Sequence, residues 1–547
     1  MDKNLIKNTM LLLSAIMLAL AWLNTSYFQP WVTFISDYCA FTSLFFFIVV
    51  IVFFKENTKI EIPYINLFLI FIILIPIIQY QFGIIIYWST AFLSSSYLIG
   101  FFLSIIFGYN YYKKDPGILN KIIFLFVICA IFQSLISIVQ WLGLSADISW
   151  IIERNSSRMY GNFAQPNHLA SFLLAALVGL LYLREKENIG WLITNTLSFI
   201  FIFSLVLTQS RTSLITFLFI TLYIIFYSKY FDNIRIKSIF YMNLIFWFLT
   251  FFTQELNVRL NESVGLNIII KSSMQQRITT GYDRIDMWKN YLSYIYDQPW
   301  FGYGWGQVQL SQYYHINSMK VWYTSSHNII LDILLWNGIV VGLLIVIFTF
   351  IFMVKIFIHL PRCELLLIYL MVFVFFIHAF FEFPLDYAYF LLPVGILIGI
   401  LQAVSNKGVH VITVRLSYFY FVIFLYVFLM VRIWWEYGWI VQENHRAVNA
   451  GLSGDKYYSV PQKVYFLDQL EAELKLIAIP KTRKLTDDEI FQLEKVVAMK
   501  PTFFNLLKFS QILISNDKIE ILNNVLHKLN ILYGFKIEKS KILELKI

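Results

Sequence analysis

The chain has 547 residues, of which 59% are hydrophobic and only 14% are charged, and its mean hydropathy is +0.68. A typical soluble domain carries about 25% charged residues, so this composition argues against a soluble multidomain protein and excludes a disordered one. The formal net charge of +9 could attract nucleic acid, but in so apolar a chain it better fits basic residues that anchor membrane helices in the cytoplasm.

Apolar runs near 20 residues recur along the chain, and this is the length that a helix needs to cross about 30 Å of hydrocarbon. The alternating pattern of a membrane barrel is absent, so the sequence predicts an all-α polytopic integral membrane protein. A sequence like a signal-peptidase site, Ala19-Leu20-Ala21, lies in the first run, but the spans that follow favour an uncleaved helix. We predict 13 spans, at residues 9–23, 31–54, 64–80, 83–108, 120–143, 167–183, 190–208, 211–228, 238–255, 327–354, 364–381, 388–404 and 414–436.

The distribution of basic residues predicts the orientation of these spans. With a cytoplasmic N-terminus, the short outer loops carry only Arg154, Arg158 and Arg211. The cytoplasmic segments then carry 16 basic residues: Lys3, Lys7, Lys55, Lys59, Lys113, Lys114, Lys121, Arg184, Lys186, Lys229, Arg235, Lys237, Lys355, Arg362, Lys407 and Arg415. Because cytoplasmic loops are enriched in Lys and Arg, the N-terminus is predicted inside and the C-terminus outside.

This topology divides the chain into four predicted parts. Residues 1–255 hold spans 1–9, and residues 327–436 hold spans 10–13. Residues 256–326 form a large outer loop. Residues 437–547 are polar with helical periodicity, and we expect a small helical domain on the outer side.

Five polar patches fall on the outer side of the membrane. They are residues 158–168, residues 208–213, residues 277–306 with Arg277, Asp283, Arg284, Trp288 and a glycine-rich stretch, residues 325–328, and residues 378–387. Ionisable groups at a membrane edge are costly, so their clustering on one face favours a functional site.

Each patch also has a structural reading. Asn167, Ser210 or Ser326 could cap a helix, and Arg211 could anchor a span at the headgroups. The glycines at 302, 304 and 306 could form a turn, since they lack the strand and helix of a dinucleotide site. His327 and His168, taken singly, are more often interfacial histidines than catalysts.

Taken together, the patches favour one chemistry. Guanidinium groups such as those of Arg158, Arg211 and Arg284 pair bidentately with diphosphate oxygens. A neutral imidazole such as that of His327 can remove a proton from a hydroxyl near neutral pH. The sequence therefore favours reaction of a lipid-linked diphosphate with an alcohol outside the cytoplasm.

No metal site or cofactor is predicted. The three cysteines are scattered in or beside apolar runs, and neither HExxH nor CxxC occurs. A metal-independent mechanism is the expectation.

Five motifs, in this order, resemble the O-antigen ligase superfamily, and most closely its bacterial protein O-oligosaccharyltransferase branch. They are Gly161 to Ala170 with Gln165-Pro166-Asn167-His168, Ser210-Arg211-Thr212, Arg284-x-x-x-Trp288 followed by Pro299 to Gly306, Ser326-His327-Asn328, and His378-x-x-x-Glu382-x-Pro384-x-x-Tyr387.

The resemblance implies roles for the matching residues. Arg211 and Arg284 would bind and stabilise the diphosphate of an undecaprenyl-linked glycan, and His327 would activate or orient the acceptor hydroxyl. Gln165 and Tyr387 match positions that support activity in the protein-glycosylating branch, while Asn167, His168 and Glu382 would shape the site. Arg211, Arg284 and His327 should then share one pocket facing the periplasm, and transfer would invert the anomeric centre.

The sequence leaves alternatives for the acceptor of the glycan and for the functional class of the protein. The superfamily also ligates glycan to lipid A core and polymerises glycan, but Gln165 favours a periplasmic acceptor protein such as a pilin. The expected partners are the undecaprenyl-diphosphate-linked oligosaccharide, that protein and membrane lipid, in the bacterial inner membrane. A transporter of lipid-linked glycan is an alternative from a different functional class, although the sequence shows no internal repeat and no polar site at the membrane midplane. A structural membrane scaffold would not explain the clustered Arg and His residues.

Overall fold

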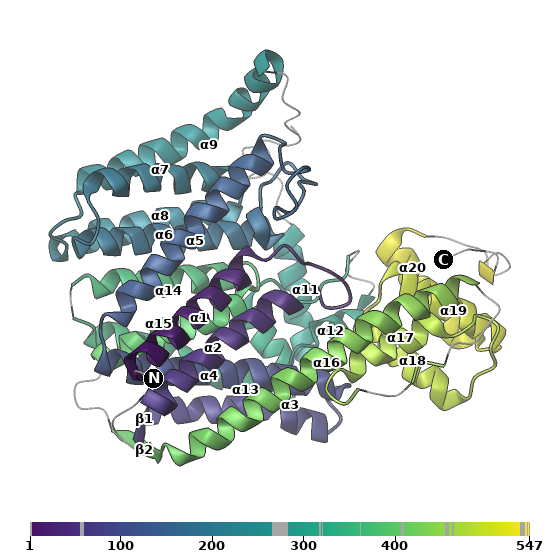
Figure 1. Cartoon of the computed structure of the whole chain (residues 1–547). Coiled ribbons are helices and arrows are strands. Elements are labelled where there is room, and N and C mark those ends of the chain that lie inside the picture. The colour runs from purple at the N-terminus through teal and green to yellow at the C-terminus, as the bar shows by residue number, and fades with distance from the viewer. Residues whose placement is uncertain are drawn as a thin grey trace. The chain divides into compact units, whose positions relative to one another are not determined.

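The computed structural model describes a chain that is almost entirely helical (Figure 1). The described residues are 3–54, 59–264, 283–316, 319, 321–361, 363–405, 410–453, 459–461, 464–535, 542–543 and 545. The outer loop predicted at 256–326 is therefore described only in part, because residues 265–282 lie outside this set.

Every predicted span coincides with a helix. These helices are α1 Lys3–Leu23, α2 Phe34–Phe54, α3 Leu67–Gln81, α4 Trp88–Lys114, α5 Ile118–Trp141, α6 Pro166–Glu185, α7 Trp191–Leu207, α8 Arg211–Tyr227, α9 Ile236–Val264, α13 Ile329–His359, α14 Leu365–Ala379, α15 Ala388–Ser405 and α16 Ser417–Ser453. Eleven of them have the length and hydropathy to cross a membrane, with α3 counted together with the preceding 3-10 turn and α8 together with the following one, whereas α7 and α14 are apolar but shorter. The all-α polytopic membrane fold is confirmed.

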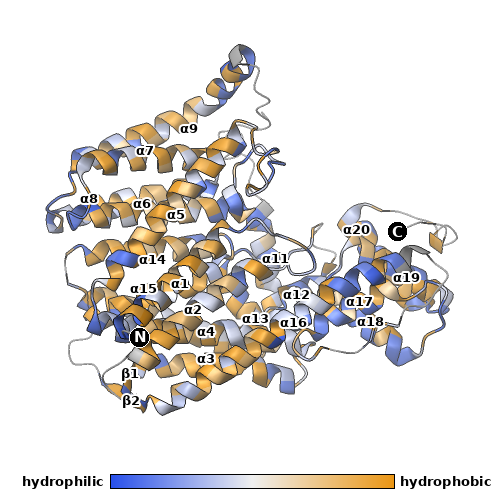
Figure 2. Cartoon of the chain, viewed as in Figure 1, coloured by the Kyte–Doolittle hydropathy of each residue, from blue (hydrophilic) through white to orange (hydrophobic). Residues whose placement is uncertain are grey.

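The remaining helices are short and, apart from the apolar helix Phe503–Ser515, more polar. They are α11 Asp283–Asp297, α12 Val308–Tyr314, α17 Asp468–Ala478, α18 Asp487–Met499, α19 Phe503–Ser515 and α20 Ile519–Tyr533, together with the 3-10 turns η1 Tyr64–Asn66, η2 Gly161–Phe163, η3 Ser228–Tyr230 and η5 Pro384–Asp386. The tail that was predicted to be helical thus contains α17 to α20, whose ribbons mix hydrophilic and hydrophobic residues where those of α5 and α6 are largely apolar (Figure 2).

The chain forms two compact units. Unit 1 comprises Met1–Asn66, Gly100–Gly281 and Ile351–Ile423. Unit 2 comprises Leu67–Ile99, Tyr282–Phe350 and Phe424–Ile547. Each unit is described by itself.

Unit 1 contains a two-stranded antiparallel ribbon that the sequence analysis missed. Strand β1, Lys59–Pro63, pairs with β2, Val411–Arg415, and the side chain of Asn110 hydrogen-bonds both the N–H and the C=O of Glu61. The last span was predicted to begin at residue 414, but Val414 and Arg415 belong to β2 and α16 begins at Ser417. Both strands alternate apolar and polar residues, which is the pattern of a β-ribbon rather than of a helix.

Close backbone contact between α4 and α15 holds part of unit 1 together. A Cβ on Gly399 would lie 2.1 Å from the carbonyl oxygen of Ile105, and one on Gly108 would lie 2.1 Å from that of Ile396. Gly395 precedes Gly399 by one helical turn, so α15 carries a small-xxx-small face. Such faces let membrane helices approach closely, because apolar burial alone gives no drive for association in lipid.

Replacement of Gly399 by Ala should destabilise the protein by about 1–3 kcal/mol, because the new methyl group overlaps the Ile105 carbonyl. Thermal unfolding of the purified protein in detergent would measure the change. The matched control is Gly438→Ala in α16, where a Cβ meets nothing within 4 Å and helix propensity favours alanine. Equal stability of the Gly399 variant and the wild type would contradict this packing.

In unit 2, α13 is broken at Gly338. This residue has φ 73° and ψ −179°, so the hydrogen bonds of the helix are interrupted there. The stretch Pro299 to Gly306 replaces them: Tyr303 N donates to Leu335 O (2.7 Å), Gly304 N donates to Trp336 O (3.1 Å), and Ile339 N donates to Pro299 O (2.7 Å).

The glycines of this stretch act as turn residues, as the structural reading of the sequence suggested. Gly302, Gly304 and Gly306 all have positive φ, and a Cβ on Gly302 would lie 2.4 Å from Leu335 O. Gln79 of α3 completes the junction, because its amide donates to Trp336 O (2.8 Å) and accepts from Trp305 N (2.9 Å). Protein groups therefore pair Leu335 O, Trp336 O and Ile339 N at the break.

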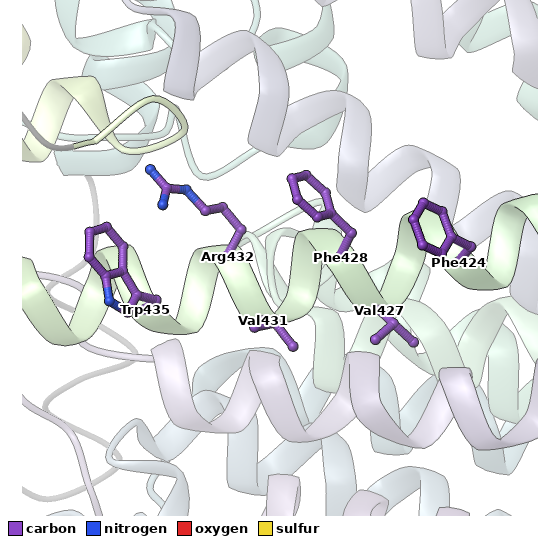
Figure 3. Close-up of a pocket in the computed structure, with 6 residues that line it drawn as sticks. All are labelled: Phe424, Val427, Phe428, Val431, Arg432 and Trp435. Carbon is purple, nitrogen blue, oxygen red and sulfur yellow. The ribbon is translucent and has the colours of Figure 1, made fainter.

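An apolar groove of about 440 Å³ runs along α16 (Figure 3). It is lined by Phe424, Val427, Phe428, Val431, Arg432 and Trp435, and it contains none of the predicted site residues. The guanidinium of Arg432 pairs with Glu436 at 3.0 Å, and the Glu436 carboxylate also accepts the backbone N–H groups of Tyr465 and Phe466.

The polar helices of unit 2 share one hydrophobic core. Side chains of α11, α12 and the start of α13 pack with those of α18, α19 and α20. Lys528 of α20 is buried beside this core, with its Nζ 3.5 Å from the centre of the Tyr313 ring. Burial lowers the pKa of Lys528 to about 8.

Lys528 should make stability depend on pH. Its pKa is lower in the folded state than in the unfolded state, so the cost of burying the charge is fully present below pH 8 and disappears as pH rises toward about 10.5. Lys528→Met should therefore melt at a higher temperature than the wild type at pH 7, and the difference should shrink between pH 8 and 10. A difference that stays constant over this range would show that the charge is not the cause.

Candidate functional site

In unit 1 the turn before α6 is held by two buried glutamines of α5. The Gln140 side chain accepts from Gly161 N (2.9 Å) and donates to Gly161 O (2.8 Å). The Gln133 side chain accepts from Asn162 N (2.9 Å). These bonds satisfy backbone groups that no helix pairs, and so they fix the position where α6 begins.

The first turn of α6 carries the Gln-Pro-Asn-His motif. Gln165 is the N-cap, and its Oε1 accepts from His168 N at 2.9 Å. Pro166 occupies the first helical position, where its missing N–H costs nothing. The suggestion that Asn167 caps a helix was wrong, since Asn167 lies inside the first turn and its side chain is used elsewhere.

Asn167 bridges a cation and an anion. Its Oδ1 accepts from Arg158 Nη2 at 2.9 Å, and its Nδ2 donates to Glu382 Oε1 at 3.0 Å. Asn167 and Glu382 are buried, whereas Arg158 is half-buried. Two of the predicted patches, residues 158–168 and residues 378–387, are therefore brought together.

Arg158 also reaches the turn that leads into α8. Its Nε donates to Thr208 O at 3.0 Å, and Met159 N donates to Leu207 O at 3.0 Å. Ser210 caps α8 by accepting from Ser213 N, as one reading of the sequence proposed, and the half-buried Arg211 is the first helical residue. The N-termini of α6 and α8 thus lie together, with two arginines beside them.

His168 lies in a cluster of aromatic rings. Its Nδ1 is 3.1 Å from the hydroxyl of Tyr389, and its ring centre is 4.7 Å from that of Tyr387. His378 lies 5.8 Å away between ring centres, and its Nδ1 is 2.7 Å from Ser171 Oγ. The cluster draws on α6, α14, α15 and the turn before α15.

Tyr387 is fixed in an environment that disfavours its phenolate. Burial raises its pKa far above the usual value, and the carboxylates of Asp386, Asp37 and Glu382 raise it further. Asp37 of α2 also accepts from the backbone N–H of Ala388 at 2.8 Å. The Tyr387 hydroxyl therefore acts at neutral pH as a hydrogen-bonding group and not as a base.

In unit 2 the segment Ser325 to Asn328 is tied to α11. Trp288 Nε1 donates to Ser326 O at 2.9 Å, and Arg284 lies one turn earlier on the same helix. His327 has φ 56°, a left-handed conformation that few residues other than glycine adopt. Asn328, and not Ser326, caps α13, because its Oδ1 accepts from Ile330 N and Leu331 N.

A buried carboxylate organises this left-handed turn. Asp332 accepts from Ser325 Oγ at 2.6 Å and from Ser326 N at 2.7 Å. Ser325 Oγ in turn accepts from His327 N at 3.0 Å. Asp332 is therefore a positioning residue for His327.

Sequence reasoning missed several of these partners. Asp332 is a lone carboxylate in an apolar run, which is a signal that was present in the sequence. Ser171 and Tyr389 had no such signal, because their contacts with the two histidines depend on which helices pack together.

Arg211 belongs to unit 1, whereas Arg284 and His327 belong to unit 2, so the convergence of these three residues in one pocket stays a prediction. Over the described residues, no group of three His, Cys, Asp or Glu side chains is arranged to hold a metal ion.

Comparison with known families matches three segments of the chain. Residues 159–183 match the family described as protein glycosylation ligase, and residues 196–347 match O-antigen ligase. Residues 366–544 match the family described as virulence factor membrane-bound polymerase, C-terminal. The first segment contains Gln165 to His168, and the second contains Arg211, Arg284 and His327. The matched families and the apolar helices together define a multi-pass bacterial membrane enzyme of the O-antigen ligase class, which transfers glycosyl groups.

Two curated relatives narrow the class. The chain is 31% identical over 529 residues to the general O-oligosaccharyltransferase of Acinetobacter baylyi, covering 93% of this chain and 90% of the relative. It is 32% identical over 359 residues to the ComP-specific O-oligosaccharyltransferase of the same organism, covering 64% of each. The chain belongs to the O-oligosaccharyltransferase family.

The Ser325 hydroxyl should be needed for activity through its hold on His327. Ser325→Ala leaves both the His327 N–H and the Asp332 carboxylate short of a partner, at a cost of about 1–3 kcal/mol, so glycan transfer should slow about tenfold or more. Ser325→Thr keeps the hydroxyl and should retain most of the rate. Equal rates of the Ala and Thr variants, measured under single-turnover conditions, would argue against this role.

Proposed function

We propose that this enzyme moves a preassembled oligosaccharide from an undecaprenyl diphosphate carrier to Ser or Thr hydroxyls of a periplasmic protein such as a pilin. The observation that carries the proposal is the arrangement around Arg158. Its guanidinium is held by Asn167 at the N-terminus of α6 and by Thr208 in the turn before α8, where Arg211 follows. Helix N-termini and arginines both favour an anion, and a diphosphate carries the matching charge.

The proposed reaction is a direct displacement. The acceptor oxygen attacks the anomeric carbon while His327 takes the hydroxyl proton, and the bond from that carbon to the diphosphate oxygen breaks. Arg211 and Arg284 stabilise the charge that develops on the departing diphosphate, so the proposal needs neither a metal ion nor a cofactor. Attack from the face opposite the leaving group inverts the configuration.

The other candidate residues serve substrate binding in this proposal. Glu382 and Asn167 hold Arg158 in place through the two hydrogen bonds that join them. Gln165 fixes the start of α6, and His168 and Tyr387 line the same region of unit 1. The match of residues 159–183 to protein glycosylation ligases supports a protein acceptor over lipid A core.

We further propose the inner membrane as the location, with the N-terminus in the cytoplasm and the C-terminus and site in the periplasm. The excess of basic residues in the connections assigned to the cytoplasm supports this orientation. A reporter fused after Tyr437 should be active on the periplasmic side, and a cytoplasmic signal would overturn the topology.

Transfer can be reconstituted with purified protein, a lipid-linked oligosaccharide and a candidate acceptor protein, with the glycan mass on the acceptor as the readout. Arg284→Ala and His327→Ala should each lower the rate by about 100-fold or more, because each removes stabilisation that exists mainly in the transition state. Arg259→Ala is the matched control, since Arg259 forms an exposed ion pair with Glu255 on α9. Full activity of both site variants would refute the assigned roles, and glycan appearing only on lipid A core would favour the ligase alternative.

A further inference from the structure

Three large aromatic side chains are exposed where α11 ends and the next stretch begins. Tyr296 is 76% exposed, and Trp300 and Phe301 are each 68% exposed. Tyr296 and Trp300 are four residues apart, and Phe301 follows directly. A soluble surface rarely exposes three such rings within six residues, so we expect this group to contact a partner. Tyr296, Trp300 and Phe301 are called the aromatic anchor below.

The aromatic anchor is attached to a membrane helix at a defined point. Ile339 N of α13 donates to Pro299 O at 2.7 Å, and a Cβ on Gly338 would lie 2.5 Å from the carbonyl carbon of Trp300. The aromatic anchor therefore lies beside the break in α13, at the same level along the axis of that helix.

The length of α13 indicates where the bilayer boundary crosses it. The helix has 31 residues, or about 46 Å at 1.5 Å per residue, which exceeds a hydrocarbon thickness of about 30 Å. The part from Gly338 to Lys355 covers about 26 Å and is apolar up to that lysine except for Thr349, whose hydroxyl donates to Ile345 O; the lysine can extend to the headgroups. That part alone nearly spans the bilayer, so the segment before Gly338 is the surplus.

Side-chain exposure follows the same division. After the break, Val340, Leu344 and Ile347 are each 52% exposed on the face that a membrane helix turns to lipid. Before the break, the helix carries the buried polar residues Asp332 and Asn337. The exposed apolar part of α13 thus begins where the backbone of Pro299 and Trp300 contacts that of Gly338 and Ile339.

We infer that α13 enters the hydrocarbon at Gly338 and that Tyr296, Trp300 and Phe301 insert into the headgroup–acyl boundary of the membrane at that level. Tyrosine and tryptophan favour this boundary because one end of each ring system is apolar and the other forms hydrogen bonds. The partner is thus a phospholipid surface. The inference does not depend on the proposed reaction.

The inference also sets the height of the left-handed turn. His327 lies 11 positions before Gly338, which is about 17 Å along the helix axis at 1.5 Å per residue. That distance places the turn beyond the headgroup layer, which adds roughly 5–8 Å on each side. The turn held by Asp332 would then work in an aqueous layer and not within lipid.

Spin labels can test the position directly in the full chain reconstituted in phosphatidylcholine nanodiscs. Cys39, Cys129 and Cys363 would be replaced, and single cysteines placed at Phe301, at Val340 and at Lys289 on the exposed polar side of α11. The ratio of collisions with oxygen to collisions with a water-soluble nickel chelate should be at least about fivefold higher at 301 and 340 than at 289. A ratio at 301 equal to that at 289 would overturn the inference, as would protection at 301 that arises only after an acceptor protein is added.

A second measurement leaves the native cysteines in place. Tryptophan emission would be compared in vesicles with and without lipid brominated near the headgroups, for the wild type and for Trp300→Phe. The wild type should lose a larger share of its emission than the variant, because Trp300 lies within reach of the bromine. Equal quenching of the two proteins would place Trp300 outside the bilayer and refute the anchor.

Discussion

A backbone N–H or C=O group that is buried away from water needs a partner within the protein, and this constraint governs the irregular segments of the protein. Helices satisfy their own N–H and C=O groups, but turns and breaks cannot. Buried amide side chains supply the missing partners: Gln133 and Gln140 for the turn before α6, and Gln79 for the break in α13. Carboxylates do the same where only N–H groups need partners, as Asp332 does for Ser326 and Glu436 for Tyr465 and Phe466. These buried polar residues therefore stabilise the irregular backbone segments, independently of any role in the reaction.

The candidate site residues lie on these same irregular segments. Gln165, Asn167 and His168 follow the turn that Gln133 and Gln140 hold, and His327 lies in the turn that Asp332 holds. Rigid support of this kind keeps a guanidinium or an imidazole in one orientation, which lowers the reorganisation needed during a reaction. The link from Glu382 through Asn167 to Arg158 extends the same principle from backbone groups to a charged side chain. The family of the chain agrees with a site of this type, since charge develops on the leaving group during glycosyl transfer and fixed polar groups stabilise it.

The sequence predicted the spans well because apolar length is a local property. Each of the 13 runs coincides with a helix, and the grouping of Arg158, Asn167 and Glu382 followed from placing their loops on one side of the membrane. Features that depend on distant contacts were missed. The β1–β2 ribbon pairs segments 350 residues apart, and the break at Gly338 needs the stretch at 299–306 to stabilise it. Capping choices such as Gln165 over Asn167 depend on which side chain reaches an N–H, and periodicity does not encode that.

The break in α13 has a consequence for how the chain is assembled. The stretch that supplies its missing hydrogen bonds, residues 299–306, precedes the helix and so leaves the ribosome first. When α13 later emerges from the translocon, the donors for Leu335 and Trp336 already exist, as does Gln79 from the much earlier α3. Biogenesis can therefore proceed from the N-terminus without ever exposing an unsatisfied helix break to lipid. Moving the 299–306 stretch to a position after α13 would reverse that order and leave the nascent span with unpaired carbonyls during insertion.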